Sequence, residues 1–131
     1  MTDYSEKIAK IERVTLGWED HGIFTCMLHL NYGHSGQGAG GYCLDEPLRG
    51  GDDKFIRRVG TAAGMEFIVR VMRAVGVGDW SELEGKTILA LGVTHTKVAG
   101  IAPLPTERGE RFIFQEWADE FYPEEVVVVG G

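Results

Sequence analysis

The sequence predicts a single α+β domain over residues 1–131, a twisted antiparallel sheet of five to six strands packed on one main helix at about residues 61–75. Three observations support this fold class. Apolar and polar residues alternate through the first third of the chain, apolar residues then recur at helical spacing, and strand-like runs follow. The chain contains no internal repeat or linker, and strands, helix, strands is an order typical of α+β domains.

The first two strands are predicted at residues 14–18 and 23–32, where side chains alternate in character. The short turn-forming segment "EDHG" joins them, so they are expected to form an antiparallel hairpin. In the second run Cys26, Leu28 and Leu30 fall on one face. The opposite face is half polar. The segment "GYCLD", residues 41–45, is predicted to return as a third strand.

Between these strands lies the glycine-rich segment "NYGHSGQGAGGY", in which Gly36, Gly38 and Gly41 match the G-x-G-x-x-G pattern of dinucleotide-binding loops. That pattern holds a pyrophosphate only when a helix follows it, because the helix N-terminus supplies the N–H groups. Here "DEP" at residues 45–47 would end any helix. The segment is therefore predicted to be a flexible strand connection, mobile over residues 33–40, with no dinucleotide site.

The main helix follows an excursion, "EPLRGGDDKF", that is predicted to be irregular. The polar stripe of the predicted helix is narrow, which predicts that the helix packs deeply against the sheet. Thr61 is the expected N-cap, and Gly76 is expected just beyond the last turn. The apolar positions at helical spacing are Met65, Ile68, Met72 and Val75.

The remainder of the chain is predicted to contain a second hairpin and two short helical turns. The strands of the hairpin are expected at residues 87–95 and 97–103, and the helical turns near 79–83 and 115–121. Residues 122–131 are interpreted as an extended tail.

Composition restricts the classes of partner. Thirteen basic and twenty acidic residues give a net charge of −7, which argues against general nucleic-acid binding because phosphates must be neutralised by Lys and Arg. No apolar run approaches the roughly 18 residues that a membrane span needs, so no membrane association is expected. Cys26 and Cys43 are interpreted as free thiols in a reducing cytoplasm.

One candidate binding site emerges, at the entrance to the main helix. Lys54, Arg57 and Arg58 precede Thr61, and Gly64 lies in the first turn. Guanidinium groups, a hydroxyl and the positive helix end could together hold a nucleotide-like or phosphate-bearing ligand. Alternatively, the arginines are solvated and the glycines permit tight packing of the helix on the sheet. No metal site, cofactor or catalytic set is predicted.

The C-terminal "VVVVGG" permits two further interpretations. Sulfur-carrier and ubiquitin-like proteins end in Gly-Gly after an extended segment, so a carrier function is one hypothesis. Four consecutive valines also form edge strands, and an exposed apolar edge favours self-association. Together with the half-apolar second face of residues 23–32, this edge predicts a homodimer.

Several motifs together resemble a family of small proteins encoded by tailed phages and prophages. They are EDHGI-x-T, GQG-x-GGY, RRVGT-x-x-G and GV-x-x-W-x-x-L-x-G-K, and they span about two-thirds of the chain. The resemblance implies phage origin and a host bacterial cytoplasm. The expected function is a non-enzymatic accessory protein that binds a host component, as a counter-defence inhibitor. The alternatives are sequestration of a small anion, the Gly-Gly carrier and an enzyme with an unrecognised site.

Overall fold

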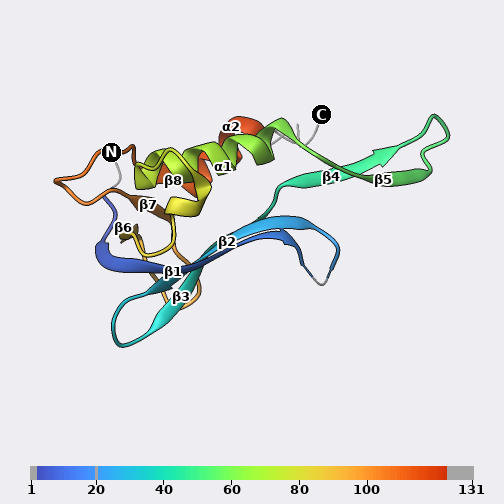
Figure 1. The fold of residues 1–131 in the computed structure, drawn as a ribbon. Helices are drawn as coiled ribbons and strands as arrows, with labels where there is room; N and C mark the ends of the chain where they lie inside the picture. Colours follow the sequence, from blue (N-terminus) through green and yellow to red (C-terminus); the bar gives the residue numbers. More distant parts are fainter. Residues whose placement is uncertain (1–2, 20, 124–131) are drawn as a thin grey trace.

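A computed structural model describes residues 3–19 and 21–123 of the protein (Figure 1). Its main layer is a six-stranded antiparallel sheet of order β3-β2-β1-β6-β7-β8. The two helices lie together on one face of this sheet, so the predicted α+β architecture is confirmed. The strands are β1 (Glu6–Trp18), β2 (Phe24–Asn31), β3 (Gly36–Cys43), β6 (Thr87–Leu91), β7 (Gly100–Ala102) and β8 (Phe112–Ile113). The helices are α1 (Ala62–Val75) and α2 (Phe114–Phe121), with a 3₁₀ turn, η1 (Trp80–Glu82).

The core lies between the helices and the sheet. Strands β1 and β2 form the predicted hairpin, in which Ile11 pairs with Leu30 and Leu16 pairs with Cys26. On β2 the alternating residues Cys26, Leu28 and Leu30 are all buried, as the period-2 pattern predicted. Helix α1 covers this face with Phe67 and Val71, which are at most 1% exposed.

The glycine-rich segment is a strand, so the prediction of a flexible connection was wrong over residues 36–40. The side chain of Met27 on neighbouring β2 explains the glycines. A Cβ atom at Gly38 would lie 2.6 Å from the Met27 sulfur, and one at Gly41 would lie 2.9 Å from its terminal carbon. The Met27 thioether therefore occupies the space that side chains at positions 38 and 41 would fill. The prediction that no helix follows is confirmed, because β3 leads into another strand.

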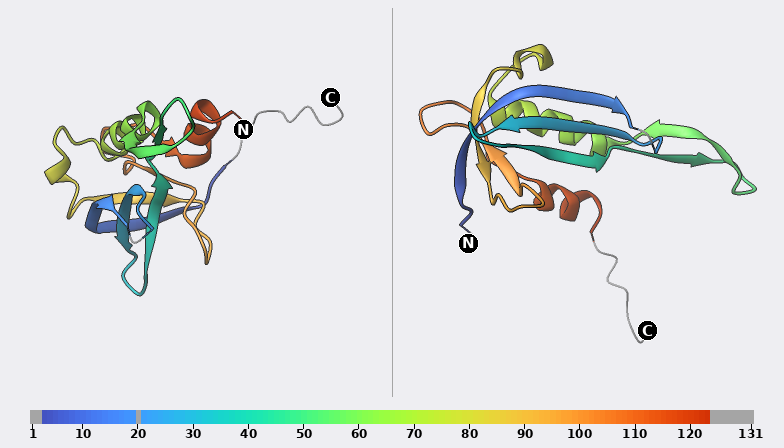
Figure 2. Two further views of the ribbon diagram at one scale, coloured as in Figure 1. Left: turned by 90° about the vertical axis from the view of Figure 1, so that its right-hand side faces the viewer. Right: turned by 90° about the horizontal axis from the view of Figure 1, so that it is seen from below.

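The excursion before the helix is also regular, which corrects the sequence prediction. It forms an antiparallel hairpin of β4 (Asp45–Arg49) and β5 (Phe55–Gly60), a separate two-stranded sheet. This hairpin, residues 45–60, projects beyond the rest of the molecule and is called the arm (Figures 1 and 2). Most of its side chains are exposed on both faces. Burial therefore imposes no apolar–polar alternation, which is the signal that identifies strands in a sequence.

Helix α1 begins and ends as predicted. The Thr61 hydroxyl accepts a hydrogen bond from the Gly64 amide at 2.9 Å, and Gly76 takes the left-handed conformation at the C-terminus. The indole N–H of Trp117 on α2 donates to the Ala63 carbonyl at 2.8 Å and so joins the two helices. Gly64 packs directly against the backbone carbonyl of Leu44, a contact that leaves no space for a Cβ atom.

The second hairpin and the two helical turns are confirmed, although the strands of the hairpin are shorter than the predicted residues 87–95 and 97–103. Strands β6 and β7 pair antiparallel, and η1 and α2 occupy the two predicted helical turns. Asp79 caps η1 by accepting from the Ser81 amide at 2.9 Å. Residues 124–131, which carry the predicted valine edge and the Gly-Gly motif, lie outside the described residues.

We predict that Gly64→Ala lowers the free energy of unfolding by about 3 kcal/mol, because the added methyl group must displace the Leu44 backbone or the helix. Chemical denaturation measures the change. Gly78→Ala is the matched control, since a Cβ atom there meets nothing within 4 Å. The control should stabilise the protein by about 0.5 kcal/mol through the unfolded chain. Equal effects of the two substitutions would contradict this role for Gly64.

Candidate functional site

The residues of the predicted anion site do not converge. Lys54 lies beside the turn of the arm, where its ammonium group is 3.8 Å from the Asp52 carboxylate. Thr61 lies at the opposite end of β5, where the strand meets α1. Its hydroxyl donates to the Leu44 carbonyl at 3.1 Å and accepts from Gly64. Gly64 is required for packing, so the alternative interpretation of tight helix packing describes this part of the site better.

Arg58 is committed to a buried carboxylate. Its Nε lies 2.8 Å from Asp45 Oδ2, and its Nη2 lies 3.0 Å from Oδ1. Asp45 also accepts from the Phe24 amide at 3.0 Å, and its side chain is 1% exposed. Arg57 is the exposed member of the arginine pair. Of the two arginines predicted to bind a ligand, Arg58 is therefore held in a structural ion pair and Arg57 is exposed to solvent.

The same junction contains Cys43. Its thiol donates to the Asp45 carbonyl at 3.1 Å and lies 3.5 Å from the Arg58 Nη2. The hydrogen bond from Arg58, followed by those from Phe24 and Cys43, overcomes the effect of burial and lowers the pKa of Asp45 to about 2. The carboxylate is therefore ionised near neutral pH and holds the base of the arm against the main sheet.

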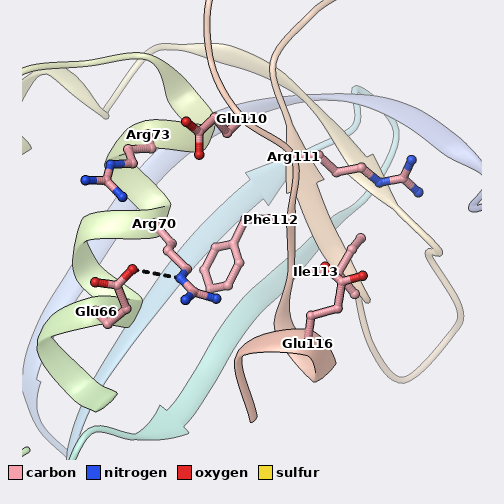
Figure 3. Close-up of a pocket in the computed structure, with 8 residues that line it drawn as sticks. All are labelled: Glu66, Arg70, Arg73, Glu110, Arg111, Phe112, Ile113 and Glu116. Atoms are coloured by element: carbon pink, nitrogen blue, oxygen red, sulfur yellow. Dashed lines mark hydrogen bonds and ion pairs between the residues drawn. The ribbon is translucent and has the colours of Figure 1, made fainter. Parts of the chain in front are cut away.

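A small polar cleft of about 220 Å³ lies between α1, β8 and α2 (Figure 3). Arg70 crosses this region and binds Glu66 at 2.8 Å and both oxygens of Glu120 at 2.8 and 2.9 Å. The guanidinium groups of Arg73 and Arg111 point away from each other. Three arginines and three glutamates line the cleft, so their charges balance. This arrangement joins the helices and offers no convergent group for a ligand.

The thiols and acidic groups assemble no metal centre in the described residues, where no three His, Cys, Asp or Glu side chains are placed to hold an ion. Both cysteines are free, and burial raises the pKa of the Cys26 thiol to about 12. Cys26 is therefore a neutral core residue. Within the same residues, no helix has the length and apolar character needed to cross a membrane.

The arm carries exposed apolar side chains on a thin support. Phe55 is 57% exposed, Ile56 53% and Leu48 36%. The register places Leu48 opposite Arg57 and Glu46 opposite Val59, so these four side chains share one face of the arm. An isolated two-stranded hairpin is only marginally stable in water. Burial of its exposed apolar side chains against another surface would therefore stabilise the arm.

An aromatic cleft of about 330 Å³ opens at the base of the arm. The ring of Trp117 meets that of Tyr42 edge to face at 5.6 Å and that of Tyr122 at 5.9 Å. Both tyrosines are partly exposed, at 37% and 51%. The cleft is lined by these three rings together with Cys43, Asp45, Glu46 and Ala118. It brings β3, β4 and α2 together at one point.

Sequence analysis missed both the arm and the aromatic cleft. A signal for the arm exists in "RGGDDK", a turn-forming segment between "EPL" and the β-prone run "FIRRV". The cleft has no comparable signal. Tyr42 and Trp117 are 75 positions apart, and only the packing of α2 beside β3 brings them together.

We predict that Asp45→Asn reduces the acid sensitivity of folding. The native pKa of Asp45, about 2, lies below the ordinary value of 3.8. Its contribution is therefore present above about pH 4 and is lost as the pH falls toward 2. Replacement should remove on the order of 2 kcal/mol at pH 7 and flatten the pH dependence between pH 4 and 2, as measured by urea denaturation.

Asp53→Asn is the control for this change, because Asp53 has a side chain 90% exposed and a positive φ of 63° that asparagine tolerates. The control should keep the acid sensitivity of the wild type. If Asp45→Asn and the wild type lose stability in parallel below pH 4, the buried carboxylate does not have the proposed role.

Comparison of the chain with protein-family models, with curated proteins and with solved structures gave no match.

Proposed function

We propose that this protein is a non-enzymatic, phage-derived accessory protein that binds a host protein through the arm. The observation that carries the proposal is the exposure of Leu48, Phe55 and Ile56 on a hairpin that projects from the molecule. Apolar side chains on a projecting element are typical of protein-binding surfaces. Interference with host defence or metabolism by occupancy is the purpose that the phage resemblance favours.

The distribution of charge supports a protein partner of basic character. The net charge is −7, so the long-range field attracts positively charged surfaces. The arm itself carries both signs, with Arg49, Lys54 and Arg57 against Glu46, Asp52 and Asp53. We infer that the arm supplies apolar contacts and local specificity, and that the acidic body increases the rate of encounter.

The other functions expected from the sequence have less support. A phosphate-bearing ligand would have to bind without Arg58, which is held by Asp45, and without the Thr61 hydroxyl, which caps α1. The Gly-Gly carrier depends on residues outside the described part of the chain. A second copy of this chain is the competing occupant of the arm, although the homodimer predicted from the sequence uses other surfaces, the valine edge and the second face of residues 23–32.

The test is site-specific photo-crosslinking in a bacterial lysate. A photoreactive residue at position 55 should capture a partner, and one at Glu82, an exposed residue of η1, should not. The mass of the product distinguishes the occupants, because a second copy gives twice the mass of the chain. Capture that is equal from both positions, or absent from position 55, contradicts a role for the arm.

We predict that Phe55→Ser with Ile56→Ser weakens binding of the captured, purified partner at least about tenfold, because two apolar anchors are lost. Isothermal titration calorimetry measures the affinity. Both side chains are more than half exposed, so the free energy of unfolding should change by less than about 0.5 kcal/mol. Trp18→Ser, which removes a 62% exposed aromatic side chain of β1, serves as the control. Unchanged affinity in the arm variant would place the contact elsewhere.

A further inference from the structure

We propose that the aromatic cleft at the base of the arm binds a cationic side chain, the guanidinium of an arginine or the ammonium of a lysine, carried by the protein that docks on the arm. The inference rests on the proposed function, because it names the chemistry of the partner at the point where the arm joins the body.

Three aromatic rings line the cleft. Tyr42 and Tyr122 flank Trp117, and each makes an interplanar angle of 64° or 76° with it. Trp117 is only 2% exposed, so the aromatic surface that a ligand can reach belongs to the two partly exposed tyrosines. A cation over the faces of these rings is attracted by the ring quadrupoles. The volume of about 330 Å³ accommodates a guanidinium group with part of its alkyl chain.

The charged groups around the cleft favour a cationic ligand. No basic side chain is among the residues that line it. Asp45 is neutralised by Arg58, whose guanidinium lies behind it in the junction. Glu46 is exposed and has no basic group within 4.0 Å in the described part of the chain. The cleft therefore combines aromatic surface with one available carboxylate, a combination that favours a cation over an anion or a neutral group.

The cleft is continuous with one face of the arm. Glu46 lines the cleft and also shares a face of the arm with Leu48, Arg57 and Val59. A partner segment that covers this face therefore meets the cleft at its end. The expected partner sequence places a basic residue a few positions from an apolar one, so that the apolar side chain contacts Leu48 and the basic one enters between Tyr42 and Tyr122.

The test is a titration of the ¹⁵N-labelled protein with the peptide Ac-Gly-Arg-Gly-NH₂. The indole N–H of Trp117 and the amides of residues 42–46 should shift and saturate at millimolar peptide. Ac-Gly-Gln-Gly-NH₂ and Ac-Gly-Leu-Gly-NH₂ are the neutral polar and apolar comparators and should not saturate. Binding should weaken as salt is added, because the carboxylate contact is partly screened.

Variants separate the two contributions. Glu46→Gln and Tyr122→Ala should each weaken the arginine peptide about fivefold, since each removes one favourable contact to the cation. Tyr122→Phe keeps the ring and should bind like the wild type. Glu82→Gln removes an exposed carboxylate of η1 and should also bind like the wild type. All three positions are exposed, so folding should be preserved, which a thermal melt verifies.

The proposal is overturned if the leucine peptide binds as tightly as the arginine peptide, if no resonance shifts at 50 mM peptide, or if neither Glu46→Gln nor Tyr122→Ala weakens binding. Its failure is distinct from failure of the proposed function, because the peptide is too short to reach Phe55 and Ile56. The variant with both of these residues changed to serine should bind the arginine peptide normally. If the arm captures a partner but the arginine peptide does not bind, the proposed function of the arm stands and the proposed cation site in the cleft is overturned.

Discussion

The carboxylate of Asp45 joins three parts of the chain that the backbone alone would leave only loosely connected. It accepts from the amide of Phe24 at the start of β2, from the guanidinium of Arg58 on β5 and from the thiol of Cys43 at the end of β3. The main sheet, the arm and the entrance to α1 are thereby held at fixed positions. A buried carboxylate is tolerated only where its hydrogen bonds are satisfied, and here both carboxylate oxygens accept from a donor. The geometry of the candidate site follows from this one group.

Close packing beside the junction has the same effect on α1. Gly64 contacts the Leu44 carbonyl, Thr61 binds the same carbonyl, and Trp117 donates to the carbonyl of Ala63, the residue before Gly64. The start of α1 is therefore fixed to the segment between β3 and β4 and to α2. Residues that resemble an anion-binding helix entrance in the sequence are used here for attachment. The same residue types suit both purposes, because a small glycine, a capping hydroxyl and an arginine also stabilise a crowded helix start.

The predictability of each element from the sequence follows from its burial. Strand β2 and helix α1 each bury one face, so alternation and helical spacing identified them, and local capping chemistry located Thr61 and Gly76. The first part of β3, residues 36–40, was missed because glycine has no side chain with which to alternate, and the Met27 side chain of β2 packs against this segment. The arm was missed because neither face is buried. Of the candidate site residues, Arg58 was identified, but its partner Asp45 was not, since pairing across 13 positions depends on the hairpin register.

The thin attachment of the arm separates the proposed partner-binding surface from the residues that determine folding. Its exposed side chains contribute little to the core, most of whose residues lie in the main sheet and the two helices. Substitutions at positions such as Leu48, Phe55 and Ile56 are therefore nearly neutral for stability while they change what the arm contacts. Under the proposed function, those positions can therefore change with the partner without loss of the fold. The Asp45 junction and the contact between Gly64 and Leu44 remain under constraint throughout.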